Sequence, residues 1–209
     1  MKLLILDFDG TLADTVPHVI NCIIKCIKKF NLKELEYDDI LRFNGAVLKD
    51  VLISLGAKKE QLLEIKEYYS KIFLEDLSDI KLYPHVYETL KKLKGNVKIS
   101  IATNRARNTL IPLLKHLNIE EFIDYIVCEN DVKNKKPNPD MVNMIKEKFI
   151  TSDEILVVGD TDFDVIMGRN ANCKTCGVYY DETPSAKLLE SKPEYLINDF
   201  SKLIQILKK

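Results

Sequence analysis

The chain has 209 residues, 46% of them hydrophobic and 30% charged, a composition typical of a globular protein and unlike that of collagen or a disordered chain. Its 31 basic and 32 acidic residues give a formal net charge of -1, which argues against a dedicated nucleic-acid binder. The apolar run at residues 3–6 is too short for a signal peptide, and no run approaches the roughly 20 residues of a membrane span. We therefore expect a cytoplasmic protein with free thiols, and neither a membrane nor nucleic acid as its partner.

Apolar runs and helical periodicities divide the chain into two parts. Residues 3–6 suit a strand buried on both faces. A part without strands follows, where the spacing predicts helices over 16–30, 37–43, 47–55 and 59–77. Thr15 is the expected N-cap of the first of these helices. Beyond residue 80, strands over 97–102, 125–128, 155–158, 175–179 and 194–197 alternate with helices over 86–93, 105–117, 140–149, 165–171 and 200–207.

This order of elements predicts the fold class. Alternating strands and helices favour an α/β fold with a doubly wound parallel sheet, because parallel strands need crossover connections. The helical part has no strand partner, so we interpret it as a domain inserted after the first strand. The predicted core domain comprises residues 1–14 and 81–209, and the predicted helical domain comprises residues 15–80.

Carboxylates follow two of the predicted strands, at the sheet edge where open parallel sheets bind ligands. Asp7 and Asp9 end the first strand in the run Asp-Phe-Asp-Gly-Thr, and Asp160 and Asp164 follow the strand at 155–158. Carboxylates crowded in this way repel one another unless a cation lies between them. Mg²⁺ binds through a few carboxylates together with water and phosphate oxygens. The four aspartates therefore indicate a magnesium site.

Two further groups near strand ends suit a phosphoryl group. Thr103 follows the strand at 97–102, and Lys136 precedes Pro137 in the loop before the helix at 140–149. A carboxylate can attack phosphorus and form an aspartyl-phosphate, which water then hydrolyses. A second carboxylate can protonate the leaving alkoxide and later activate the water. Together these residues favour phosphoryl transfer.

In these motifs the chain resembles the haloacid-dehalogenase (HAD) superfamily, particularly its phosphoglycolate phosphatase-like branch. The four motifs occur in order, as Asp7-Phe8-Asp9-Gly10-Thr11-Leu12, Thr103, Lys136, and Gly159-Asp160 with Asp164. The helical part lies where that family inserts a helical cap. The resemblance implies a Rossmann-like core, a hydrolase acting on phosphoric monoesters, an aspartyl-phosphate intermediate and Mg²⁺ as cofactor.

The resemblance also implies a role for each aspartate. Asp7 would be the nucleophile, with its carboxylate on the metal. Asp9 would be the general acid and base, with its main-chain carbonyl on the metal. Asp160 would bind Mg²⁺ directly, and Asp164 would bind it directly or through water.

Substrate contacts are implied at four further positions. Thr103 and the backbone around Asn104 would bind the phosphoryl oxygens, and Lys136 would neutralise charge on Asp7 and on the phosphoryl group. In the predicted cap, Arg42 is a candidate partner for a substrate carboxylate, and an exposed helix arginine is the alternative interpretation.

Other activities share parts of this pattern. A β-phosphoglucomutase-like mutase is disfavoured by Leu48 and Gly159, where that branch has arginine and commonly glutamate. Dehalogenases and phosphonatases lack the carboxylate that is present here as Asp9. A pyrophosphatase stays open, as does a phospho-accepting or binding protein without turnover. We expect a phosphatase for a small phosphorylated metabolite, acting as a monomer or homodimer.

Overall fold

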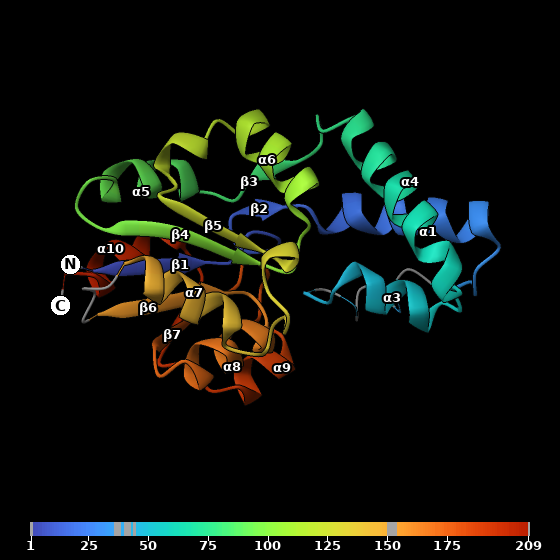
Figure 1. Cartoon of the computed structure of the whole chain (residues 1–209). Helices are drawn as coiled ribbons and strands as arrows, with labels where there is room; N and C mark the ends of the chain where they lie inside the picture. Colours follow the sequence, from blue (N-terminus) through green and yellow to red (C-terminus); the bar gives the residue numbers. More distant parts are fainter. Residues whose placement is uncertain (1, 36–38, 40–42, 44, 150–153, 209) are drawn as a thin grey trace.

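The computed structural model describes residues 2–35, 39, 43, 45–149 and 154–208. Its centre is a parallel sheet of six strands in the order β5-β4-β1-β6-β7-β8, which confirms the predicted fold class (Figure 1). The strands are β1 (Leu3–Leu6), β4 (Lys98–Thr103), β5 (Tyr125–Cys128), β6 (Ile155–Gly159), β7 (Lys174–Val178) and β8 (Tyr195–Ile197). The first strand of the chain is thus a central strand, paired with β4 on one side and β6 on the other.

Helices cover both faces of this sheet. Successive residues of a strand point to opposite faces, so β1 contributes side chains to both layers of the core. Leu4 and Leu6 of β1 pack in the core cluster that includes α5, α6 and α10, whereas Leu3 and Ile5 pack in the cluster with α7 and α8. The helices are α5 (Val86–Leu93), α6 (Arg107–His116), α7 (Asp140–Lys148), α8 (Asp162–Asn170), α9 (Ala186–Glu190) and α10 (Leu203–Ile206). An all-apolar β1 is therefore explained by burial on both sides.

The helical part lies beyond the carboxyl ends of the strands, on the right in Figure 1. It contains α1 (Val16–Phe30), α3 (Leu48–Ser54) and α4 (Leu62–Glu75), and α1 packs on α4. The stripe predicted for the longest of these segments is buried, namely Leu62, Ile65, Tyr69, Ile72 and Phe73. Most of the helix predicted over 37–43 lies outside the described residues. The division into two domains stays a prediction.

A short ribbon joins the two parts. The strands β2 (Ala13–Asp14) and β3 (Lys81–Leu82) pair antiparallel, so the chain leaves and re-enters the α/β part at adjacent points. Two-residue strands carry too little periodicity to be predicted. The same holds for the 3₁₀ turns η1 (Lys59–Gln61), η2 (Glu120–Phe122), η3 (Glu129–Asp131) and η4 (Phe200–Lys202).

α6 contains a proline in its interior, Pro112, and runs through it from Arg107 to His116. Proline lacks a backbone N–H, so this costs one helical hydrogen bond. The neighbouring residues Leu110, Leu113 and Leu114 are fully buried, and this packing holds the helix together.

The five cysteines are free thiols and all are buried. Burial raises the pKa of Cys22 to about 11 and the pKa of Cys26, Cys128 and Cys176 to about 12, and it also raises the pKa of Cys173. Because only the thiolate reacts with a disulfide reagent, a raised pKa lowers reactivity. We expect slow labelling by an aromatic disulfide at pH 8 in the folded protein and rapid labelling of all five cysteines in urea. Rapid labelling without urea would contradict the buried placement.

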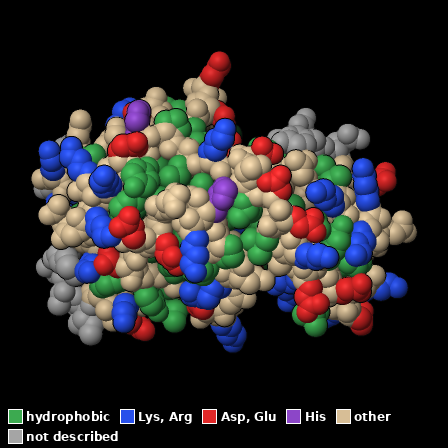
Figure 2. Space-filling model, turned by 90° about the horizontal axis from the view of Figure 1, so that it is seen from above, with side chains coloured by type: hydrophobic (Ala, Val, Ile, Leu, Met, Phe, Trp, Pro, Cys, Tyr) green, Lys and Arg blue, Asp and Glu red, His purple; other side chains and the backbone are tan. Residues whose placement is uncertain are grey.

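Among the described residues, no helix is both long and apolar enough to cross a membrane. On the face drawn in Figure 2, basic and acidic side chains are interspersed, and neither sign dominates a large area of that face. This distribution matches the near-zero net charge of the sequence.

Candidate active site

Asp7 directly follows β1 and lies at the carboxyl end of the sheet. Its backbone N–H donates to the carbonyl of Val158, 2.9 Å away, so the ladder between β1 and β6 extends to this residue. The ammonium of Lys136, whose side chain is only 2% exposed, lies 2.7 Å from Asp7 Oδ1 and 2.6 Å from Asp164 Oδ1. One buried cation thus joins two carboxylates that are far apart in the sequence.

The adjacent Lys135 lies elsewhere: its ammonium donates to the carbonyl of Val132. Lys136, which directly precedes Pro137, was the predicted site residue, and its ammonium lies beside Asp7. The carboxylates of Asp164 and Asp7 raise the pKa of Lys136, although burial alone would lower it. This lysine therefore stays charged at neutral pH.

Asp7, Asp160 and Asp164 form an acidic cluster, in which one carboxylate oxygen of each lies within 4.8 Å of the other two. Burial raises the pKa of Asp7 to about 7, against the opposing effect of Lys136. Buried carboxylates held this close fit a hard divalent cation, and Mg²⁺ accepts such oxygen ligands together with water and phosphate oxygens. Three of the four expected metal-binding residues thus lie together.

The loop after β1 positions Asp160. Thr11 Oγ1 donates to Asp160 Oδ1 at 2.8 Å, and the hydroxyl of Tyr180 donates to the Thr11 carbonyl at 2.7 Å. Gly10 has φ +75°, a left-handed conformation that favours glycine. A Cβ at Gly10 would lie 2.3 Å from Asp160 Oδ2, so only glycine leaves room for this carboxylate.

Asp164 is fixed by the start of α8. Its Oδ2 accepts hydrogen bonds from the backbone N–H and the hydroxyl of Thr161, in a capping box that begins the helix. Thr161 is the N-cap of α8, and Asp162 is the first helical residue. Asp164, three residues beyond Thr161, supplies the reciprocal carboxylate of the capping box.

Asp9 is held by two groups whose contact with it the sequence analysis missed. Arg105 Nε and Nη2 donate to both carboxylate oxygens, the shortest distance being 2.6 Å. Thr15 Oγ1 donates to Asp9 Oδ1 at 2.5 Å. Thr15 precedes α1 as predicted, but its side chain makes no cap hydrogen bond. The Arg105 guanidinium also lies 4.3 Å from the ring centre of Phe73 in α4, so both parts of the chain position Asp9.

Thr103 is the last residue of β4 and Asn104 follows it, and both are buried beside these groups. Thr103 Oγ1 accepts a hydrogen bond from the backbone N–H of Arg105 at 3.1 Å. The Asn104 amide donates to the Gly45 carbonyl at 2.8 Å and accepts from the Lys136 backbone N–H at 3.2 Å. Asn104 therefore connects three loops through its side chain. Arg42 lies outside the described residues.

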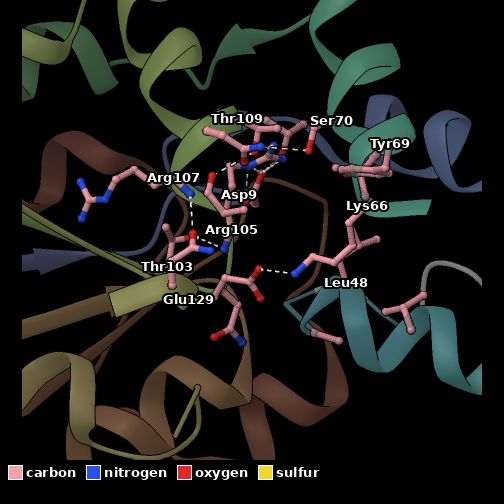
Figure 3. Close-up of a pocket in the computed structure, with 18 of the residues that line it drawn as sticks. Asp9, Leu48, Lys66, Tyr69, Ser70, Thr103, Arg105, Arg107, Thr109 and Glu129 are labelled. Atoms are coloured by element: carbon pink, nitrogen blue, oxygen red, sulfur yellow. Dashed lines mark hydrogen bonds and ion pairs between the residues drawn. The ribbon is translucent and has the colours of Figure 1, made fainter. Parts of the chain in front are cut away.

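A cavity of about 830 Å³ lies between the helical part and the sheet. Asp7, Asp9, Thr103 and Lys136 form part of its wall. In the close-up of Figure 3, Lys66 reaches from α4 toward the buried Glu129, 3.1 Å away. This ion pair spans the cavity wall between the two parts, and neither residue stands in a motif that could have predicted it.

The sheet, the motif order and this cluster define the class of protein. The sequence profile of the family described as haloacid dehalogenase-like hydrolase matches residues 4–178. The chain belongs to this family and is a hydrolase, which confirms the resemblance drawn from its motifs.

The similarity to known proteins extends over almost the whole chain. A pyrophosphatase PpaX from Bacillus mycoides is 31% identical over 206 residues, covering 97% of this chain and 95% of the relative. A hydrolase from Pseudomonas syringae has a similar structure, with a TM-score of 0.85, 26% identity, and coverage of 100% of this chain and 98% of the other. A structure described as a predicted phosphoglycolate phosphatase from Haemophilus somnus has a TM-score of 0.82 at 24% identity, covering 99% and 98% of the two chains, and shares the fold.

Proposed function

We propose that this protein is a Mg²⁺-dependent phosphatase that hydrolyses a small phosphomonoester through an aspartyl-phosphate on Asp7. The observation that carries the proposal is the buried ammonium of Lys136 between Asp7 and Asp164, with Asp160 in the same cluster. This arrangement keeps a carboxylate nucleophile beside a fixed positive charge at the wall of a cavity. The proposal includes the phosphoglycolate phosphatase-like branch of the family and a small phosphorylated metabolite as the substrate.

The first step is in-line attack. An Asp7 oxygen forms a bond to phosphorus as the bond from phosphorus to the ester oxygen breaks. Asp9 gives its proton to the departing alkoxide, which leaves as an alcohol. Thr103 and the backbone around Asn104 bind the phosphoryl oxygens, and Lys136 offsets their negative charge.

The second step returns the enzyme to its starting state. Asp9, now a carboxylate, takes a proton from water, and the resulting hydroxide attacks phosphorus. The bond to Asp7 breaks, releasing inorganic phosphate and the free carboxylate. Arg105 and Thr15 hold Asp9 in the resting protein, so Asp9 must exchange at least part of these contacts to reach the leaving oxygen.

Asp7, Asp160 and Asp164 are the side chains that we propose to hold Mg²⁺, together with the main-chain carbonyl of Asp9. When bound, the ion would neutralise negative charge on the phosphoryl group and on Asp7. Both oxygens of Asp164 already accept hydrogen bonds, from Lys136 and Thr161. Asp7 and Asp160 are therefore the carboxylates we propose for direct contact.

The test is phosphate release from a panel of esters, with Mg²⁺ and with EDTA. The panel contains phosphoglycolate, sugar phosphates, nucleoside monophosphates, an aromatic phosphate and pyrophosphate. Release that requires Mg²⁺ would support the proposal. A folded protein that releases phosphate from none of them would overturn it and favour a binding role without turnover.

Pyrophosphatase activity is the second candidate, because the relative from Bacillus mycoides carries that name at 31% identity. Pyrophosphate in the same panel separates the two activities. A structure described as a putative β-phosphoglucomutase from Thermotoga maritima is also similar, but at 24% identity this likeness concerns the fold. We propose a cytoplasmic setting, a monomer or homodimer, and no nucleic-acid or membrane partner.

Gly10→Ala is expected to lower phosphate release by about 10²-fold or more, because the added Cβ would displace the Asp160 carboxylate. The matched control is Gly56→Ala. Gly56 has a similar φ of +87°, but nothing lies within 4 Å of its Cβ position. Both variants carry the same kind of backbone strain, about 1–2 kcal/mol. Steady-state rates should show a loss of activity in the Gly10 variant alone, and melting temperatures should show a larger destabilisation there, because the clash with Asp160 adds to the shared backbone strain. Equal activities would contradict the placement of Asp160.

A further inference from the structure

We propose that the leaving group of the substrate is an uncharged, largely apolar organic alcohol, and neither phosphate nor a carboxylic acid. This inference rests on the proposed function and names the substrate class of the same cavity. It departs from the activity in the name of the Bacillus mycoides relative. Three features of the cavity carry it: its size, the charge state of its wall and its apolar side chains.

The volume of about 830 Å³ lies in the range of pockets that enclose drug-sized organic ligands. The phosphoryl site at Asp7, Thr103 and Lys136 takes up one end of this space. Pyrophosphate or phosphoglycolate would leave much of the remaining wall in contact with water only. The cavity is therefore larger than either small anion needs.

Positive charge on the wall is already neutralised. Among the described residues that line the cavity, every lysine or arginine lies within 4 Å of a carboxylate of the protein. The pairs are Lys66–Glu129 at 3.1 Å, Arg105–Asp9 at 2.6 Å, Arg107–Asp131 at 2.5 Å and Lys136–Asp7 at 2.7 Å. A second anionic group would have to break one of these pairs, whereas an uncharged group would not.

Apolar side chains from both parts of the chain form much of the remaining wall, beside polar ones that include Glu67, Ser70 and Asn108. The apolar side chains include Val19 and Ile23 of α1, Leu48 of α3, Leu63 of α4, and Ile111 and Pro112 of α6. Leu63 is 71% exposed although it lines the cavity that leads to Asp7. An exposed leucine at this place gains burial only when an apolar ligand covers it.

The experiment is a series of n-alkyl phosphates from ethyl to hexyl, assayed with Mg²⁺ beside pyrophosphate and phosphoglycolate. These alkyl esters release alcohols of similar acidity, so differences in kcat/KM report the fit of the chain. We expect kcat/KM to rise about fourfold per added methylene, the value for burial of one such group. Hexyl phosphate should be hydrolysed with a higher kcat/KM than pyrophosphate or phosphoglycolate.

A matched pair of variants tests the wall itself. Leu63→Ser should lower kcat/KM for hexyl phosphate by about tenfold and leave kcat/KM for ethyl phosphate nearly the same. The control is Leu189→Ser, since Leu189 is an exposed leucine, 48% accessible, on α9 and outside this cavity. Both sites are exposed, so neither change should unfold the protein.

A flat series, a preference for phosphoglycolate, or equal effects of the two variants would overturn the inference and leave the phosphatase proposal intact. A preference for pyrophosphate would overturn the inference and favour the pyrophosphatase candidate instead. Absence of release from every compound, with the protein folded, would overturn both.

Discussion

Replacement of Asp7 by asparagine is expected to lower the rate of phosphate release by on the order of 10⁴-fold or more. The amide has the shape of the carboxylate but cannot act as the nucleophile on phosphorus. The fold should survive, because Lys136 keeps its partner Asp164 at 2.6 Å and one buried charge is removed. Phosphate release and the melting temperature of the pure variant are the measurements.

The control for this change is Asp162→Asn. Asp162 follows the same strand end as Asp160, but it lies outside the acidic cluster. It should keep most of the wild-type rate. If the Asp7 variant released phosphate at the wild-type rate, Asp7 would not be the nucleophile and the aspartyl-phosphate would have to be abandoned.

The change of Lys136 to methionine is expected to damage both activity and stability. It leaves the buried carboxylates of Asp7 and Asp164 close together without their shared cation. Removing one partner of a buried ion pair costs about 3–5 kcal/mol of unfolding free energy. Loss of a charge that stabilises the phosphoryl group should lower the rate by about 10²- to 10³-fold.

Urea unfolding in EDTA and phosphate release in Mg²⁺ measure these two effects separately. Lys135→Met is the matched control, since the ammonium of this neighbouring lysine donates to the main-chain carbonyl of Val132. That variant should unfold and react much like the wild type. A Lys136 variant as stable and as active as the Lys135 variant would refute the bridging role.

Most of the sheet and the acidic cluster could be predicted because their signals are local. β1 and β6 are short apolar runs that end in aspartates, and parallel strands bring such ends to one edge. The stripe of α4, from Leu62 to Phe73, repeats with the helical period and is buried as expected. Lys136 was selected by its place before Pro137, and it contacts Asp7.

The contacts that the sequence did not predict depend on tertiary structure. Arg105 stands two residues after Thr103, and nothing local indicates that its guanidinium reaches back to Asp9. Thr15 has a residue type and position that suit a helix cap, yet the nearby Asp9 carboxylate takes its hydroxyl. Lys66 and Glu129 come from segments that meet only once the helical part lies over the sheet. Their charges alone gave no sign of pairing.

The central position of β1 has a consequence for the protein while it is being synthesised. β1 is made first, but its partners begin only at Lys98 and Ile155. At about 5–20 residues per second, the interval between Asp7 and Asp164 is on the order of 10 to 30 s. Until β4 has been made, this strand of leucine and isoleucine has no partner strand, and exposed apolar segments of this kind are prone to aggregate without chaperones. The nascent chain therefore carries Asp7, the proposed nucleophile, from the start, and the acidic cluster is complete only after β6 and α8 have left the ribosome.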